Sequence, residues 1–371
     1  MAVRDGDRLT VGVEEEYLVV DPVSRAVRPE ADSVIAHAAK ELGDGVSAEI
    51  TRFQIEARTD PHTELAGLGA QIRSMRAAVA EAAALQGLRV VSSGSPVLGT
   101  VIPPPLTEGP RYARSFETFR ALDDEQSVCA CHVHVGLADR SRALAVSNHL
   151  RPWLPVLVAL GANSPYWAGR DTGYASWRTV TWARWPVAGP PPFFQSVTHF
   201  EELVGQFSIS GSIMDRSGLY WDVRPSEHVP TLELRVADAA MTVEDTLLFT
   251  AVTRALVDTA LRAVEIGEPA PNPSPEALRA AYWRAARDGL GGQGFDLRTG
   301  RLVPAAVLAD GLLAHLSAAL ERHGDLGLVR AGWARLRAHG TGADRQRAAY
   351  RRRARLHDVV DCLIAMTTQG I

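Results

Sequence analysis

Acidic, imidazole and guanidinium side chains recur in short strand-like segments of this sequence of 371 residues. The segment Leu9–Asp21, LTVGVEEEYLVVD, places apolar residues at alternate positions, which is typical of a β-strand. Glu14 and Glu16 point to one face of this strand and Glu15 to the other. Carboxylates in an apolar strand repel one another and resist desolvation, so something cationic must hold them. A pair on one face suits Mg²⁺, whereas the alternative is an exposed edge strand with its acidic side chains in water.

Three further strand-like segments carry polar pairs at alternate positions. They are Gln54 and Glu56 in EITRFQIEART (49–59), His132 and His134 in SVCACHVHVGL (127–137), and Glu233 and Arg235 in TLELRVA (231–237). Because side chains alternate across a strand, the two members of each pair share a face. Glu49 has the opposite parity from Glu56, so a β-bulge would be needed to bring it to the same side.

A sheet that collected these groups on one face would hold both cations and anions. Carboxylates bind Mg²⁺, and guanidinium groups bind phosphate or carboxylate in their fork geometry. Without an obvious nucleophile, this combination indicates phosphoryl chemistry, in which positioning and charge neutralisation supply most of the rate. Each pair taken alone is weak evidence: His132 and His134 fit a solvent-facing pair equally well, and Glu233 with Arg235 fits a surface ion pair.

The elements that must position these groups indicate an α+β protein. Helices are expected at 31–42, 63–86, 141–161, 243–266, 275–288, 303–322, 326–338 and 342–367, and further strands at 88–93 and 219–224. The strands lie mostly in the first two thirds and do not alternate regularly with helices, which favours a largely antiparallel sheet over a doubly wound one. No linker or internal repeat divides the sequence, so we expect one domain over residues 1–371.

Two segments rich in turn residues are expected to form mobile rims that close over the substrate, Pro103–Tyr112 and Gly173–Phe194. The stretch 163–194 holds four of the eight tryptophans, with Arg178 and Arg184 among them. Aromatic loops of this length in a compact protein are usually functional.

The composition excludes several classes of protein. The sequence is 46% hydrophobic and 22% charged with a net charge of −4, so it can build a core and gives no electrostatic reason to expect nucleic acid. It has no apolar run of bilayer-spanning length and no signal-peptide pattern at its start, so we expect a cytoplasmic protein that does not contact membrane. Its three cysteines are too few for a disulfide framework or a zinc knuckle.

Five segments together resemble the carboxylate–amine ligases of the glutamate–cysteine ligase superfamily, the YbdK-like group. They are GVEEEY (12–17), FQIEARTDPH (53–62), CACHVHVG (129–136), GYASWRTVTWARWP (173–186) and LELRVADAAMTVED (232–245). The segments occur in the family's order, and the resemblance extends over about residues 9–368. It implies a glutamine-synthetase-like catalytic fold, with a curved, mostly antiparallel sheet and helices packed outside. It also implies ATP-dependent joining of a carboxylate to an amine through an acyl phosphate, with release of ADP and phosphate.

The resemblance also assigns roles to residues. The expected ligands of two or more Mg²⁺ ions are Glu14, Glu16, Glu56 and Glu233, with His132 touching metal or phosphate and Glu49 as a further ligand or a contact to the amine. Arg235 would neutralise the transferring phosphoryl group, and Arg178 and Arg184 would clamp a substrate carboxylate or the phosphates. Arg235, His134 and Gln54 are the expected contacts to ATP.

The expected partners are small molecules, an amino acid such as glutamate and an amine, and weak glutamate–cysteine ligase activity is one expectation. A homodimer is left open. Two alternatives use the same acidic and histidine-bearing face: a metal-dependent hydrolase that activates water, and an inert nucleotide-binding module.

Overall fold

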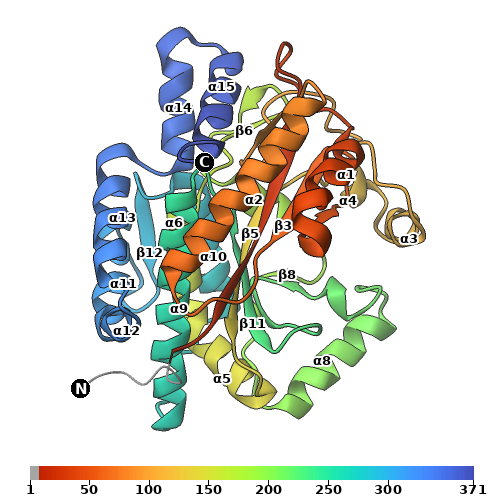
Figure 1. Ribbon diagram of the computed structural model, residues 1–371. Coiled ribbons are helices and arrows are strands. Elements are labelled where there is room, and N and C mark those ends of the chain that lie inside the picture. The colour runs from red at the N-terminus through yellow and green to blue at the C-terminus, as the bar shows by residue number, and fades with distance from the viewer. Residues whose placement is uncertain (1–7) are drawn as a thin grey trace.

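The computed structural model describes residues 8–371, and a seven-stranded antiparallel sheet lies at its centre (Figure 1). The strand order is β10-β11-β5-β1-β3-β2, and β4 pairs with the last residues of β1. The strands of this sheet are β1 (Val11–Val20), β2 (Val46–Ala48), β3 (Gln54–Arg58), β4 (Arg89–Val91), β5 (Ala130–Gly136), β10 (Val223–Pro225) and β11 (Thr231–Asp238). The predicted α+β class with a mostly antiparallel sheet is therefore confirmed.

Helices surround the sheet and continue into a second helical layer in the last third of the sequence (Figure 1). They are α1 (Ala31–Leu42), α2 (Leu65–Leu85), α3 (Pro110–Phe119), α4 (Ala121–Asp124), α5 (Arg140–Leu150), α6 (Leu154–Leu160), α7 (Trp177–Trp182), α8 (Val197–Ile209), α9 (Val243–Glu265), α10 (Pro275–Asp288), α11 (Ala305–His315), α12 (Ser317–His323), α13 (Leu326–His339), α14 (Gly342–Arg353) and α15 (Leu356–Thr367). No helix between residues 8 and 371 is long and apolar enough to cross a membrane.

Six short strands form three separate pairs outside the main sheet. They are β6 (Tyr166–Trp167) with β7 (Arg170–Asp171), β8 (Ala188–Gly189) with β9 (Tyr220–Trp221), and β12 (Gln293–Asp296) with β13 (Arg301–Pro304). The β8–β9 pair is parallel and joins the aromatic segment to the chain just before β10.

The central strands have one apolar face, as their alternation predicts. Val13 of β1 pairs with Val133 of β5, which pairs in turn with Leu234 of β11. These three side chains are buried in the largest apolar cluster, together with residues of α2, α5 and α9. Helix α9 is buried along most of its length because it contacts both the sheet and the outer helices α12 and α13. The hydrophobic effect therefore fixes the opposite face of the same strands toward the cavity described below.

Glu15 is the exception on this apolar face. Its carboxylate accepts hydrogen bonds from Nε and Nη2 of Arg76 in α2, at 2.9 and 2.8 Å, and the two side chains are 1% and 0% exposed. Tyr17 and Thr246 also donate to it. Burial raises the pKa of Glu15, but the charge and hydrogen bonds of Arg76 outweigh this effect and lower it. The cation that we expected from the sequence to neutralise this carboxylate is therefore a side chain of the protein itself, Arg76.

The remaining N–H groups of Arg76 link distant parts of the sequence. They donate to the main-chain oxygens of Ala240, Met241 and Thr367, at 2.9, 3.3 and 3.3 Å. The loop before α9 and the end of α15 are thereby held against β1 and α2. A buried ion pair of this kind is tolerated because nearly all of its donors and acceptors are used.

Several predicted boundaries were wrong. The single strand expected at 49–59 is a turn followed by β3, because Thr51 accepts a backbone hydrogen bond from Gln54 at 3.0 Å. The helix expected at 342–367 is two helices, since Ala354 takes a left-handed φ of 54° and its N–H caps α14 on the Tyr350 oxygen.

Two further predicted elements were also divided. Residues 301–304 form β13, and the helix expected at 303–322 is α11 and α12. The strand expected at 219–224 is split between β9, which pairs with β8, and β10, which pairs with β11. The segment 141–161 is helical as predicted, with a 3-10 turn between α5 and α6.

We expect Arg76→Met to lower the free energy of unfolding by about 3–5 kcal/mol, because it leaves the Glu15 carboxylate buried without its cation. The matched control is Arg73→Met, about one turn earlier on α2. This change removes the ion pair between Arg73 and Glu244, in which the two side chains are 38% and 40% exposed. It should lower the free energy of unfolding by at most about 1 kcal/mol. Urea unfolding followed by circular dichroism measures both, and equal losses would contradict the role given to Arg76.

Candidate active site

The polar face of the sheet places its charged groups in adjacent rows. Strand β1 lies between β3 and β5, so that Glu14 is opposite His132 and Glu16 is opposite Glu56. One strand further, Glu233 of β11 is opposite a histidine of β5. The residues predicted from four separate segments therefore share one face.

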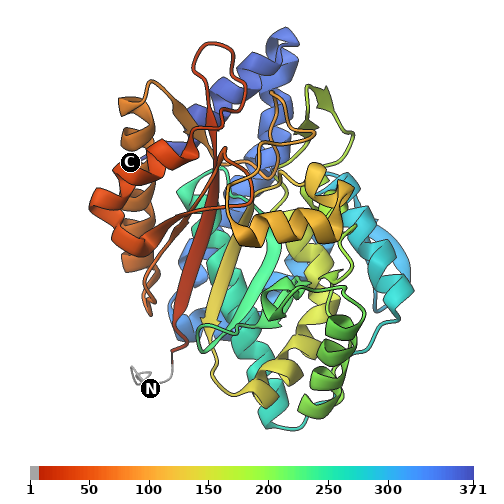
Figure 2. The same cartoon turned by 90° about the vertical axis from the view of Figure 1, so that its right-hand side faces the viewer.

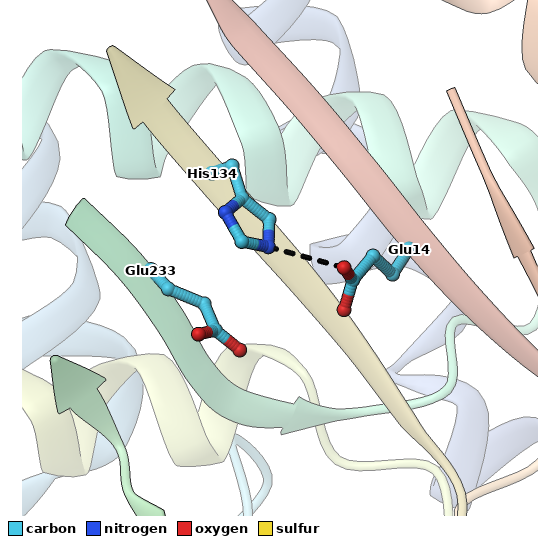
Figure 3. A group of neighbouring side chains, drawn as sticks. All are labelled: Glu14, His134 and Glu233. Atoms are coloured by element: carbon cyan, nitrogen blue, oxygen red, sulfur yellow. Dashed lines mark ion pairs between the residues drawn. The ribbon is translucent and has the colours of Figure 1, made fainter. Parts of the chain in front are cut away.

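Glu14 lies at the centre of these rows. Its Oε2 is 2.9 Å from Nδ1 of His132, and its Oε1 is 3.3 Å from Nε2 of His134. Figure 3 shows Glu14, His134 and Glu233 converging from three neighbouring strands. Burial raises the pKa of Glu14, but the hydrogen bonds from the two histidines outweigh it and hold the pKa well below its usual range. Glu14 is therefore ionised at neutral pH.

His132 presents a free nitrogen to the same face. An ionised Glu14 can only accept a hydrogen bond, so Nδ1 of His132 donates to it and Nε2 carries the lone pair. This Nε2 is buried without a hydrogen-bond partner and lies 3.9 Å from Glu16. Burial and the nearby charge of Arg235 lower the pKa of His132 to about 4. A neutral imidazole with a buried, unused lone pair is suited to a metal ion.

Three carboxylates form the other end of the site. Glu16, Glu49 and Glu56 each place an oxygen within 4.8 Å of the others. Burial and the charges of neighbouring carboxylates raise the pKa of Glu16 and of Glu49 to about 7, and raise that of Glu56 well above its usual value. A hard divalent cation would relieve this repulsion, because carboxylate oxygens are the ligands it prefers.

Two further groups of the same kind adjoin the first. Glu14, Glu56 and His132 form one, and Glu14, His134 and Glu233 form the other. The groups share Glu14 and Glu56, so they describe one extended cluster. The donor set of carboxylates and unpartnered imidazole nitrogens therefore fits more than one divalent ion.

Glu233 is held between two arginines. Its carboxylate accepts from Arg224 at 2.7 and 3.3 Å and from Nη1 of Arg235. Burial raises the pKa of Glu233, but Arg235 and Arg224 outweigh it and lower the pKa well below its usual range. Sequence reasoning missed Arg224, although it faces Glu233 across the predicted strand pair.

Most of these groups, though not Glu233 or His134, line a cavity of about 300 Å³. Helix α3, orange-yellow in Figure 2, lies across the strands on this side. Arg111 and Tyr112 of α3 line the cavity, as do Trp182 and Trp185 of the aromatic segment. An ion pair from Arg111 to Asp215 holds α3 in place. Both predicted rims thus border the acidic face, and their mobility stays a prediction.

The other predicted site residues differ in their surroundings. Arg178 is buried, lines the cavity and donates to the main-chain oxygen of Arg235 at 2.9 Å. Arg184 is not among the lining residues and pairs with Glu125 at the surface. Gln54 lines the cavity, but its amide is used by the protein, accepting from Thr51 and donating to the main-chain oxygen of Val128.

Two more placements complete the predicted set. Glu49 reaches the acidic face through the turn at 51–53, so a turn takes the place of the predicted bulge. His134 does not line the cavity; its Nδ1 is 2.8 Å from the Thr231 hydroxyl and its Nε2 faces Glu14.

Residues 10–361 match the model of glutamate–cysteine ligase family 2. A relative from Saccharopolyspora erythraea is 46% identical over 361 residues, which cover 97% of this chain and 95% of that protein. Another from Nocardia farcinica is 44% identical over 371 residues, covering 98% of this chain and 94% of that protein. Both carry the provisional name glutamate–cysteine ligase 2-1.

Two solved structures have a similar fold. A glutamate–cysteine ligase from Francisella tularensis, in complex with AMP, has a TM-score of 0.72 at 11% identity and covers 98% of this chain and 89% of its own. A bifunctional glutathione synthetase from Pasteurella multocida has a TM-score of 0.71 at 14% identity, covering 98% of this chain and 52% of its own. At these identities the likeness concerns the fold alone, and it confirms the predicted glutamine-synthetase-like architecture.

We expect Mg²⁺ to raise the melting temperature more at about pH 8 than at about pH 6, because protonated carboxylates must lose their protons before they bind a cation. Glu16 and Glu49, whose pKa values are about 7, are the groups concerned. Without metal they bind more protons in the folded chain than in the unfolded chain. Their contribution to stability is therefore present below the unfolded pKa of 4.5 and lost as the pH rises through about 7.

Glu56→Gln should abolish most of this Mg²⁺ effect, since Glu56 belongs to two of the three ligand groups. The control is Glu81→Gln on the exposed side of α2. Thermal unfolding with and without Mg²⁺ measures the shift for each protein. The assignment of the carboxylate cluster to a metal is wrong if both variants keep the full shift.

Proposed function

Because the chain belongs to glutamate–cysteine ligase family 2, we propose that it joins a carboxylate to an amine in an ATP-dependent reaction that releases ADP and phosphate. The observation that carries the proposal is one cavity in which a buried guanidinium, Arg235, adjoins a cluster of metal-ligand side chains. Positive charge that is fixed beside bound metal ions is what stabilises a transferring phosphoryl group.

The side chains suggest how the metal ions would be divided. Glu16, Glu49 and Glu56 would hold one ion. Glu14 and Glu233 would hold another, with His132 or His134 supplying a nitrogen. Mg²⁺ bound in this way would neutralise the phosphate oxygens of ATP and align them with the acceptor. Glu14 contributes in a second manner, because it accepts the Nδ1 proton of His132 and so leaves the Nε2 lone pair free for a metal ion.

The proposed reaction has two steps. An oxygen of the substrate carboxylate attacks the γ-phosphorus of ATP, and the bond from that phosphorus to the ADP oxygen breaks. The amine nitrogen then attacks the acyl carbon of the resulting acyl phosphate. A C–N bond forms, the C–O bond to phosphate breaks, and the nitrogen loses its extra proton to solvent or a base.

Arg235 and Arg178 would serve both steps. Arg235 is only 9% exposed, and its Nη1 bonds to Glu233 and lies 3.3 Å from Nδ1 of His132, so its position is fixed before substrate binds. Arg178 is bonded to the main chain of Arg235 and would bind a carboxylate group of one of the substrates. Helix α3 would keep water away from the acyl phosphate.

The relatives' names supply the first substrates to test, with glutamate as the acid and cysteine as one amine. The part in catalysis given to Arg184, the contact of Gln54 and His134 with ATP, the single domain over 1–371, the cytoplasmic location and the homodimer all stay predictions.

A screen of amino acids against amines, with ATP and Mg²⁺, tests the function directly. We expect at least one pair to release ADP faster than either substrate alone. Turnover of a substrate in the absence of ATP would instead indicate a metal-dependent hydrolase. Binding of ATP with no ADP release for any pair would indicate an inert nucleotide-binding module, and either result would overturn the proposal.

We expect Arg235→Lys to lower the rate of ADP release by about a hundredfold, because lysine keeps the charge but loses the fork that meets two oxygens at once. The control is Arg262→Lys on α9, where the arginine side chain is 51% exposed and far from the cavity. The steady-state rate and the melting temperature are measured for both. Unchanged turnover in the Arg235 variant would show that the ion pair between Arg235 and Glu233 has a structural role only.

A further inference from the structure

A second cavity, of about 620 Å³, adjoins the acidic one. Three residues line both cavities and so form their common wall: Arg178 and Trp182 of α7 and Trp185 just after it. Trp221 and Trp283 also line the second cavity, which we call the aromatic cavity. Its volume lies within the range of about 300–1,000 Å³ found for sites that bind small organic molecules. The proposed reaction gives it no role so far.

Asp222 is the buried carboxylate of the aromatic cavity. It is 4% exposed, and its carboxylate makes no ion pair within the described part of the chain. The buried hydroxyl of Tyr282 lies beside it as a neutral hydrogen-bond donor. Burial raises the pKa of Asp222, and the positive charge of Arg178 opposes this change. A buried carboxylate without a cationic partner costs stability unless a ligand supplies the missing positive charge.

The main chain holds Asp222 rigidly. Its N–H donates to the Gly189 oxygen, and its own oxygen accepts from the N–H of Arg235, both at 2.8 Å. The residue is therefore the direct neighbour of Arg235 across two paired segments. The main chain of Asp222 is thus bonded to that of a residue lining the acidic cavity.

Arg178 offers the opposite charge on the same cavity. Its Nη2 is used by the Arg235 oxygen, but its Nε is buried without a partner. Arg178 and Asp222 are not paired with each other. Arg151, the other buried guanidinium of this cavity, is already bonded to the Pro191 oxygen and to Asn272. The cavity thus presents, among aromatic rings, a buried carboxylate and a guanidinium whose Nε has no partner.

We propose that the aromatic cavity binds the amine substrate, and that this substrate is an α-amino acid with an aromatic or large apolar side chain. Its ammonium would donate to Asp222, its carboxylate would meet Arg178, and its side chain would lie among Trp182, Trp221 and Trp283. Indole rings also attract an adjacent cation, which favours an ammonium at this place over a neutral group. The inference rests on the proposed ligase function and adds the class of its second substrate.

Calorimetry with L-phenylalanine, in the absence of ATP and Mg²⁺, tests the binding directly. Two analogues each lack one charge: 2-phenylethylamine has no carboxylate, and 3-phenylpropionate has no ammonium. We expect L-phenylalanine to bind at least about tenfold more tightly than either one. Equal affinity for L-phenylalanine and 3-phenylpropionate would overturn the role of Asp222.

Asp222→Asn should weaken L-phenylalanine about tenfold or more and leave 3-phenylpropionate unchanged. Asp171→Asn, which alters an exposed carboxylate outside the cavity, is the control and should weaken neither. If the asparagine variant does not fold, Leu203→Trp replaces it. Leu203 is half-buried on α8 and lines the cavity, so the larger ring should block L-phenylalanine without removing a buried contact.

A purine is the competing occupant. Adenosine that displaces L-phenylalanine and that loses affinity in Asp222→Asn would assign the cavity to the nucleotide and overturn the proposal.

The ADP-release screen is separate from these binding measurements. ADP release with other amines, but no binding of L-phenylalanine, would leave the ligase function standing and would contradict the proposed binding site in the aromatic cavity. Binding that depends on Asp222, with no ADP release for any pair, would support this binding site and contradict the ligase function.

Discussion

Repulsion among buried carboxylates is the constraint on which the rest of this structure depends. β1 carries three carboxylates in succession. Because side chains alternate along a strand, these carboxylates lie on two faces of the sheet, one apolar and one polar. On the apolar face Glu15 is neutralised permanently by Arg76, which fixes where α2 lies against the sheet. On the other face Glu14 and Glu16 meet further acidic and imidazole groups, and the chain leaves them to be completed by what binds there.

The charge on the polar face changes in a regular way across the strands. At the β10–β11 edge, Arg224 and Arg235 keep Glu233 ionised. Toward β3 no arginine of residues 8–371 is as close, and burial raises the pKa of Glu16 and of Glu49 to about 7. One end of the cavity thus carries fixed cations, and the other carries carboxylates that would lose their protons if a metal ion bound there.

Regular strands made much of this site predictable from the sequence. Parity along a strand is set by backbone geometry, so Glu14, Glu16, His132 and Glu233 could be placed on one face without knowledge of the fold. The hydrogen bonds of a side chain could not be predicted where the backbone turns. Gln54 lines the cavity, as its parity with Glu56 suggested, but its amide accepts from Thr51 and donates to the Val128 oxygen. No local sequence pattern marked Asp222 as a site residue, because the aromatic cavity that it lines is enclosed by segments that are separate in the sequence.

The hydrogen bonds of Arg76 also constrain the order in which the chain can fold. Its partners Ala240, Met241 and Thr367 lie 164, 165 and 291 residues further along the sequence. Contacts of such separation require large loops to close, and they form late. A nascent chain that has already made β1 and α2 must carry the Glu15–Arg76 pair incompletely bonded until α15 has been synthesised. The central strand is therefore translated well before the segments that complete the hydrogen bonds of its buried ion pair.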